Sequence, residues 1–115
     1  MKILAIDDVR DFPQAWITAR TYKMGLRCLR DMGPWDELRL DHDLGAVHMS
    51  YNDTGKEMTG YDICLFLEEN LDHRPRVIVL VTSNPVGKKK METSLASMGY
   101  EQARTGGDLW ELEKE

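Results

Sequence analysis

The chain has 115 residues, of which 42% are hydrophobic and 30% are charged, and its formal net charge at pH 7 is −5. These values indicate one folded domain and argue against a disordered chain. The negative charge disfavours broad binding to duplex DNA or to an anionic membrane, and the apolar runs are too short to span a bilayer. No signal peptide is visible, and the two cysteines lack the spacing of a zinc site, so we expect a soluble cytoplasmic protein.

Strand-like and helix-like segments alternate in the first part of the chain. Residues 2–6 (KILAI) and 15–19 (AWITA) are typical of short strands. Thr21 is a candidate N-cap for a helix that a Gly-Pro pair ends, and residues 37–41 (ELRLD) predict a third strand. Only about eight residues join the first two strands, too few for a helical crossover. These strands are therefore either antiparallel or joined by a degenerate crossover.

The second part of the chain begins with a long connection. It runs from His42 to about Thr59, and connections of this length are usually functional or mobile. An amphipathic helix is expected over residues 61–71, and the apolar run 76–81 (RVIVLV) is typical of a central strand. Asn84, followed by proline, predicts the cap of a last helix.

The alternation of elements predicts an α/β fold with a mostly parallel sheet covered on both faces, a three-layer sandwich. About five strands are expected, the last of them near residues 100–104, and the first helix is missing or degenerate. Residues 1–105 are assigned to this domain. Residues 106–115 are expected to be a charged C-terminal tail, in which Trp110 and Leu112 could serve as anchors.

Acidic residues follow two of the predicted strands. Asp7 and Asp8 come directly after the first strand, and Asp41 and Asp43 follow the third. Ligands of open α/β sheets bind beyond the carboxyl ends of the strands, so these carboxylates could converge there. Converging carboxylates repel each other, and a divalent cation relieves the repulsion. The sequence therefore predicts a site for Mg²⁺ or Mn²⁺ at Asp7, Asp8 and Asp41. Alternatively, these aspartates only start loops and cap helices, and point into solvent.

Other polar residues predict phosphate binding and proton transfer. Lysines in the first turn of the last helix oppose the helix dipole, which is understandable if an anion binds near Lys88. The alternative is a solvated basic face. Arg10 could reach the same anion, with Asn84 as a further phosphate ligand. His42 lies between two aspartates and is a candidate general acid or base, or else a structural hydrogen-bonding residue.

This pattern resembles the receiver domains of two-component signalling. Those domains carry an acidic pair after the first strand, here Asp7-Asp8, and an aspartate after the third, here Asp41. They also carry a hydroxyl residue after the fourth strand, matched by Thr82 or Ser83. The resemblance implies phosphate transfer to Asp41. The lysine that receivers carry after the fifth strand has no counterpart here, which argues against ordinary phosphotransfer.

A closer resemblance is to the cyclic-phosphate-processing receiver-like domains of bacteria and phages. It covers most of residues 1–100. The matching motifs are the acidic pair with its arginine (Asp7 to Arg10), LDHDLG (Leu40 to Gly45), a Thr-Gly-Tyr-Asp helix start (Thr59 to Asp62) and an Asn-Pro-x-Gly turn leading to a methionine (Asn84 to Met91). Members often carry His-Ser where this chain has Val81 and Thr82.

The resemblance implies a metal-dependent phosphoesterase acting on a cyclic nucleotide or on the 2′,3′-cyclic phosphate of an RNA end. The segment from Asn52 to Gly55 would close over the substrate. Two alternatives are an inactive module that binds a nucleotide or a protein partner, such as a phage protein countering host defence in the host cytoplasm, and a phosphate-accepting receiver. The implied site has Asp41, His42 and Asp43 as catalytic residues, Arg10, Asn84 and Lys88 as phosphate ligands, and Asp7, Asp8 and Asp41 as metal ligands.

Overall fold

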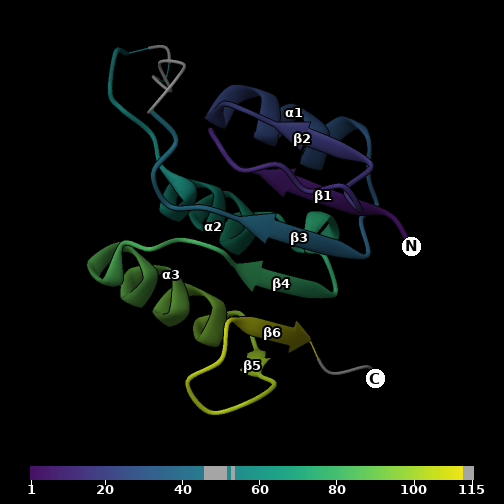
Figure 1. The fold of residues 1–115 in the computed structure, drawn as a ribbon, viewed down its shortest axis with the longest axis vertical. Helices are drawn as coiled ribbons and strands as arrows, with labels where there is room; N and C mark the ends of the chain where they lie inside the picture. Colours follow the sequence, from purple (N-terminus) through teal and green to yellow (C-terminus); the bar gives the residue numbers. More distant parts are fainter. Residues whose placement is uncertain (46–51, 53, 113–115) are drawn as a thin grey trace.

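A computed structural model describes residues 1–45, 52 and 54–112, and within them the chain forms one six-stranded sheet and three α-helices (Figure 1). The strands run in the order β2-β1-β3-β4-β6-β5. The first four of these are parallel, whereas β6 is antiparallel to both of its neighbours. The elements are β1 (Ile3–Ile6), β2 (Ile17–Ala19), α1 (Tyr22–Asp31), β3 (Glu37–Leu40), α2 (Gly60–Glu69), a 3₁₀ turn (Leu71–His73), β4 (Val77–Leu80), α3 (Pro85–Ser97), β5 (Tyr100–Gln102) and β6 (Leu109–Leu112).

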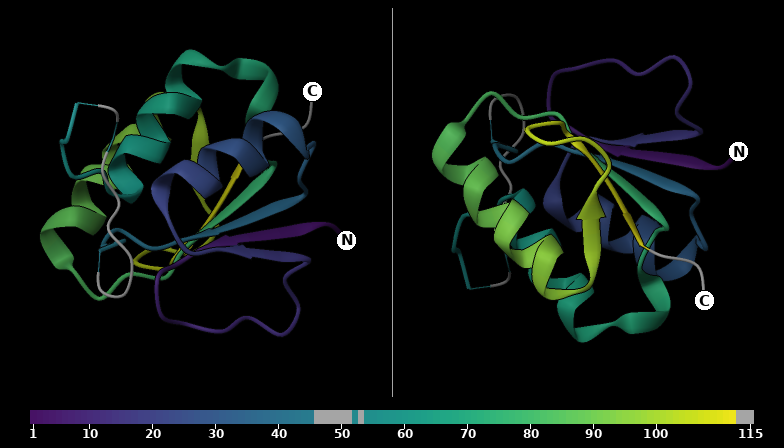
Figure 2. Two further views of the ribbon diagram at one scale, coloured as in Figure 1. Left: turned by 90° about the horizontal axis from the view of Figure 1, so that it is seen from above. Right: turned by 90° about the horizontal axis from the view of Figure 1, so that it is seen from below.

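The α/β class and the mostly parallel sheet are confirmed, but the three α-helices lie on one face of the sheet (Figure 2). From β2 onward every helical crossover advances across the sheet in the same direction, and right-handed crossovers then place their helices on the same face. On this face Leu4, Leu38 and Ile78 are completely buried in the core. The expected third layer is therefore absent from the described part of the chain.

The opposite face of the sheet is contacted by residues 7–16, which form the connection between β1 and β2. Arg39 of β3 points to this side, where its guanidinium lies 5.8 Å from the centroid of the Phe12 ring. Its Nη1 also donates to Gln14 Oε1 at 3.2 Å. The antiparallel alternative for the first two strands is wrong, since β1 and β2 pair in parallel. The degenerate crossover is confirmed, because residues 7–16 hold no helix.

Strand β6 was not predicted. Residues 109–112, which were expected to belong to a charged tail, lie between β4 and β5 in the sheet. The chain turns back after β5, and Gly106 adopts a φ of +76° within this turn, a conformation that favours glycine. Trp110 is buried in the core, so its expected role as an anchor is confirmed. The strand is only four residues long and has charged neighbours, which explains why its pattern was not recognised.

The predicted helix caps position the start of each helix next to the end of a strand. Thr21 Oγ1 accepts from Met24 N at 3.2 Å, and Asn84 Oδ1 accepts from Gly87 N at 3.0 Å. Thr59 caps α2 in a reciprocal capping box. All three helices therefore begin at the carboxyl edge of the parallel strands. None of the helices described here has both the length and the apolar composition needed to span a bilayer.

Candidate active site

Three buried carboxylates meet at the carboxyl edge of the sheet. Asp7 and Asp8 follow β1, Asp41 follows β3, and the two strands are paired in register, Ile6 beside Leu40. One carboxylate oxygen from each aspartate lies within 4.8 Å of the others. The side chains are enclosed, since Asp41 is only 5% exposed and Asp7 is not exposed at all. The structure thus brings together the three residues that were predicted as metal ligands. We call them the carboxylate cluster.

Arg10 supplies a positive charge inside this cluster. Its Nη1 lies 3.1 Å from Asp7 Oδ2 and 3.2 Å from Asp41 Oδ2, so one guanidinium bridges the ends of two strands. The hydrogen bond to Asp7 and the negative charge of Asp41 raise the pKa of Arg10. The other oxygen of Asp7 accepts from the main-chain amides of Val9 and Arg10, at 3.0 and 2.8 Å, which fixes the carboxylate. Arg10 was predicted to bind phosphate, and its guanidinium lies at the carboxyl edge of the sheet, where a phosphate was expected to bind.

Arg20, which no motif in the sequence pointed to, contacts the same segment through its guanidinium. Its Nη1 donates to the main-chain oxygen of Arg10 at 2.7 Å and to that of Asp7 at 3.3 Å. Its Nη2 pairs with Asp11 at 2.6 Å. The guanidinium therefore fixes the backbone of residues 7–11. A motif search could not identify it, because the role depends on the parallel pairing of β1 and β2.

The environment of Asp41 favours its neutral form. Burial is the main cause that raises the pKa of this carboxyl group, and the charge of Asp7 raises it further. The main-chain amide of His42, which donates to Asp41 Oδ1 at 2.8 Å, together with the hydroxyl of Thr82 and the charge of Arg10, partly opposes the rise. The charge of Arg10 thus does not offset the effect of burial on Asp41.

The raised pKa of Asp41 predicts a definite pH dependence of stability. The folded state binds the proton of Asp41 more tightly than the unfolded state does, because the pKa of Asp41 is raised on folding. The contribution of Asp41 to the free energy of unfolding is therefore present at low pH. It is lost as the pH rises from the pKa of the unfolded state through the pKa of the folded state. We expect the free energy of unfolding of the metal-free protein to fall, relative to that of Asp41→Asn, between acidic and neutral pH. Urea denaturation across that range measures it. A difference that is constant with pH, or that grows, would contradict the assignment.

Asp43 does not join the carboxylate cluster, so the expected convergence of four carboxylates is reduced to three. Its side chain is 64% exposed, and Asp43 Oδ1 lies 2.9 Å from His42 Nδ1. The Nδ2 of Asn84 lies 3.4 Å from both oxygens of Asp43. His42, Asp43 and Asn84 therefore form a second polar group. The strand β3 ends at Leu40, so the alternation of a strand, which would place Asp43 on the same side as Asp41, no longer applies there.

Two glycines allow the helices to approach these groups closely. A Cβ at Gly60, the first residue of α2, would lie 1.9 Å from the main-chain oxygen of Asp41. A Cβ at Gly87 in α3 would lie 2.4 Å from Cγ of the His42 ring. Both glycines belong to motifs noticed in the sequence, but nothing in those motifs indicated why glycine is required. The contacts show that it is required for packing against the site.

Lys88 is engaged with another partner. It forms an ion pair with Asp108, which lies in the turn between β5 and β6. This hydrogen bond raises the pKa of Lys88. The pair is solvent-accessible, and such pairs contribute little stability, so a phosphate could compete for the lysine. Phosphate binding by Lys88 stays a prediction, as do the roles given to Arg10 and Asn84.

The expected closing segment, Asn52 to Gly55, is described only in part. Asn52 Oδ1 accepts from the main-chain amides of Thr54 and Lys56, at 3.0 and 2.9 Å, and from Thr54 Oγ1 at 2.8 Å. These bonds define a turn. Residue 53 of this segment, and residues 46–51 before it, lie outside the described residues.

The carboxylate cluster fits a hard divalent cation. Mg²⁺ and Mn²⁺ prefer oxygen ligands, and Mg²⁺ is usually bound by one or two carboxylates together with waters and substrate oxygens. Here three buried carboxylates offer such oxygens and share one nearby guanidinium, that of Arg10. The donor set of three buried carboxylates is what such an ion requires.

Comparison with known proteins agrees with this geometry. The sequence model of the family described as the cyclic-phosphate processing receiver domain matches residues 2–97. No match was found among curated proteins or among solved structures. The matched range includes the carboxylate cluster, Arg10, His42 and the Asn-Pro-x-Gly turn, and it ends before β5. The chain therefore belongs to the family of cyclic-phosphate-processing receiver domains.

Proposed function

We propose that this protein is a metal-dependent phosphoesterase that opens a cyclic phosphodiester, in a cyclic nucleotide or at an RNA end. The observation that carries the proposal is the enclosure of Asp7, Asp8 and Asp41 at the carboxyl edge of the sheet with one guanidinium between them. Such a cluster is costly unless a cation completes it. Membership in a family linked to cyclic-phosphate processing supports the same substrate class.

The reaction consumes one water. Its oxygen forms a bond to phosphorus, the bond from phosphorus to one ring oxygen breaks, and that oxygen takes up a proton to leave a phosphomonoester. A bound Mg²⁺ or Mn²⁺ would polarise a phosphoryl oxygen and lower the pKa of a bound water. The proposed ligands of this ion are Asp7, Asp8 and Asp41.

The chain's own residues would supply the remaining functions. Arg10 extends into the cluster from a partly exposed position, so its guanidinium could bind a phosphoryl oxygen and stabilise the charge that develops there. His42, which is hydrogen-bonded to Asp43, is the candidate for proton transfer. Asn84 beside Asp43 would hold the phosphate or the imidazole in place.

A second candidate function is a binding module without turnover. Val81 and Thr82 occupy the positions at which the resemblance expects His-Ser, and the Thr82 hydroxyl acts to lower the pKa of Asp41. If the missing histidine is the proton donor of the family, the chain would retain the ligand but would not open the ring.

The proposal is tested by incubating the protein with 2′,3′-cyclic nucleotides and cyclic dinucleotides in the presence of Mn²⁺, followed by chromatography. We expect one class of ring to be opened, and we expect EDTA to abolish the activity because the carboxylates alone cannot activate water. Activity that persists in EDTA would contradict the role of a metal. A ligand-dependent rise in melting temperature without product would favour the binding module.

A further inference from the structure

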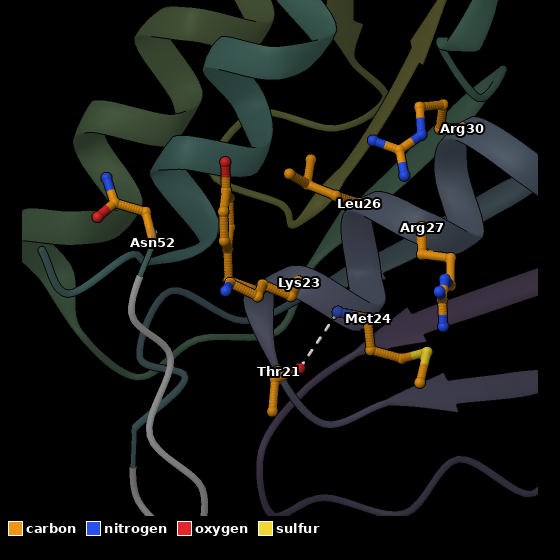
Figure 3. A pocket seen from close by; sticks show the side chains of 8 residues that line it. Thr21, Lys23, Met24, Leu26, Arg27, Arg30 and Asn52 are labelled. Carbon is orange, nitrogen blue, oxygen red and sulfur yellow. Dashed lines mark hydrogen bonds between the residues drawn. The ribbon is translucent and has the colours of Figure 1, made fainter. Parts of the chain in front are cut away.

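A cleft of about 600 Å³ runs along α1 and is distinct from the carboxylate cluster. Figure 3 shows the side chains of α1 on one side of it and Asn52, from the connection between β3 and α2, on the other. We call it the α1 cleft. The lining residues used below are Lys23, Arg27, Arg30, Tyr22, Leu26 and Asn52.

The α1 cleft is basic although the chain is acidic. Lys23, Arg27 and Arg30 are spaced by four and three residues, which places them along one side of the helix. Arg30 lies 3.3 Å from Asp31, but both side chains are more than half exposed, so this pair contributes little. In a chain with a net charge of −5, three cations along one cleft create a local field that attracts an anion.

The α1 cleft also offers apolar surface between its charges. Figure 3 shows Leu26 between Lys23 and Arg30. Tyr22, in the first turn of the helix, is partly buried in the same lining. Single-stranded nucleic acid is bound by this combination, in which cations contact the phosphates and aromatic or apolar side chains contact the bases. An acidic peptide would use the cations but would gain less from the apolar surface.

Two connections place the α1 cleft beside the carboxylate cluster. On one side, the amide of Asp7 donates to the main-chain oxygen of Ala19 at 3.1 Å, and α1 begins only three residues later. On the other side, burial raises the pKa of the Tyr22 hydroxyl, and the negative charge of Asp62 raises it further. Asp62 belongs to the first turn of α2, which packs against Asp41 through Gly60.

We propose that the α1 cleft binds the nucleotides that precede a 3′-terminal 2′,3′-cyclic phosphate, so that the substrate is an RNA end rather than a free cyclic mononucleotide. This inference rests on the proposed function of the carboxylate cluster. A cyclic mononucleotide carries a single phosphate, for which Arg10 is already available. The further phosphates of an RNA strand would meet the cations of the α1 cleft, of which Arg27 and Arg30 are tested below, whereas a cyclic mononucleotide has no further phosphate to place there.

The test compares two substrates and two matched variants. The substrates are a short single-stranded RNA ending in a 2′,3′-cyclic phosphate and the corresponding cyclic mononucleotide. The variant Arg27→Gln/Arg30→Gln removes two arginines from the α1 cleft, whereas Arg76→Gln/Arg104→Gln removes two exposed arginines from other parts of the surface. We expect the first variant to lower kcat/KM for the RNA at least about tenfold and to leave the mononucleotide unaffected. The salt dependence for the RNA should become shallower by about 1.4 in the log–log slope, for two lost phosphate contacts.

Several results would overturn the inference. One is that the wild-type protein opens the mononucleotide as efficiently as the RNA; another is that both variants affect the RNA equally. If neither substrate is opened, fluorescence anisotropy with the same RNA, labelled, tests RNA binding by the α1 cleft independently of hydrolysis. Binding that Arg27→Gln/Arg30→Gln weakens would support the α1 cleft while the proposed hydrolysis fails. No binding, or binding that polyglutamate of the same length displaces equally well, would reject the α1 cleft as an RNA site.

Discussion

Replacing Asp41 by asparagine is expected to lower kcat/KM for ring opening by at least about 10³-fold, which corresponds to about 4 kcal/mol of transition-state stabilisation. Asparagine has almost the same shape and can still accept the hydrogen bond that His42 N donates to Asp41 Oδ1 at 2.8 Å. It cannot supply the negative charge that a cation needs, nor the ion pair with Arg10. Rates are measured by chromatography of the opened product with Mn²⁺ present.

Asp11→Asn is the matched control for this substitution. Asp11 lies on the loop after β1 that also carries Asp7, Asp8 and Arg10, but its side chain is 87% exposed and pairs with Arg20 rather than with the cluster. Its replacement should leave the rate within about twofold, as expected for a surface site. If Asp41→Asn retains more than a tenth of the wild-type activity, Asp41 is not a ligand of the catalytic metal.

Gly60→Ala is expected to lower the free energy of unfolding by about 3 kcal/mol and to impair the site at the same time. The new Cβ would lie 1.9 Å from the main-chain oxygen of Asp41 and 2.9 Å from its carbonyl carbon. Either the backbone at Asp41 or the start of α2 must therefore move. The hydrogen bond from Gly60 N to His42 O, at 2.8 Å, ties the same two segments together. Helix propensity acts in the opposite direction, since alanine is favoured over glycine inside a helix by up to about 1 kcal/mol. Urea denaturation measures the net change.

Gly45→Ala serves as the comparison. Among the described atoms, its Cβ would meet the Glu57 carboxylate at 3.4 Å, an ordinary contact at the tip of a flexible side chain. We expect its effect on unfolding to stay within about 0.5 kcal/mol. Equal stability of the two variants would show that α2 can shift away from Asp41 without cost, and that Gly60 does not fix the geometry of the site.

The carboxylate cluster could be predicted because it depends on simple local rules. Asp7 follows a short apolar strand, Asp41 follows a short strand in which charged and apolar residues alternate, and parallel strands present their carboxyl ends at one edge. The separation of Asp43 from the cluster could not be predicted. It depends on the path of the backbone after β3 and on His42 packing against Gly87, a contact between residues far apart in the sequence.

The arrangement of the layers could not be predicted from the sequence, for a different reason. A parallel sheet is usually covered on both faces, and alternation of elements alone does not show that a face lacks its helices. Here β1 is joined to β2 by a loop and not by a helix. After β5 the chain adds the antiparallel strand β6 to the sheet, and no helix covers the second face in the described part of the chain. Arg10 shows a similar limit. Its approach to the site was predicted, but its ion pairs with both Asp7 and Asp41 are seen only in the structure.

The most direct test of the account is a titration of the protein with Mn²⁺ at neutral pH, followed by electron paramagnetic resonance of the free ion. If the carboxylate cluster is a metal site, the wild-type chain binds one Mn²⁺, Asp41→Asn loses this binding, and Asp11→Asn retains it. If the wild-type chain binds no Mn²⁺, or binds it equally well after Asp41→Asn, the carboxylate cluster is not the metal site and a metal-dependent phosphoesterase is contradicted.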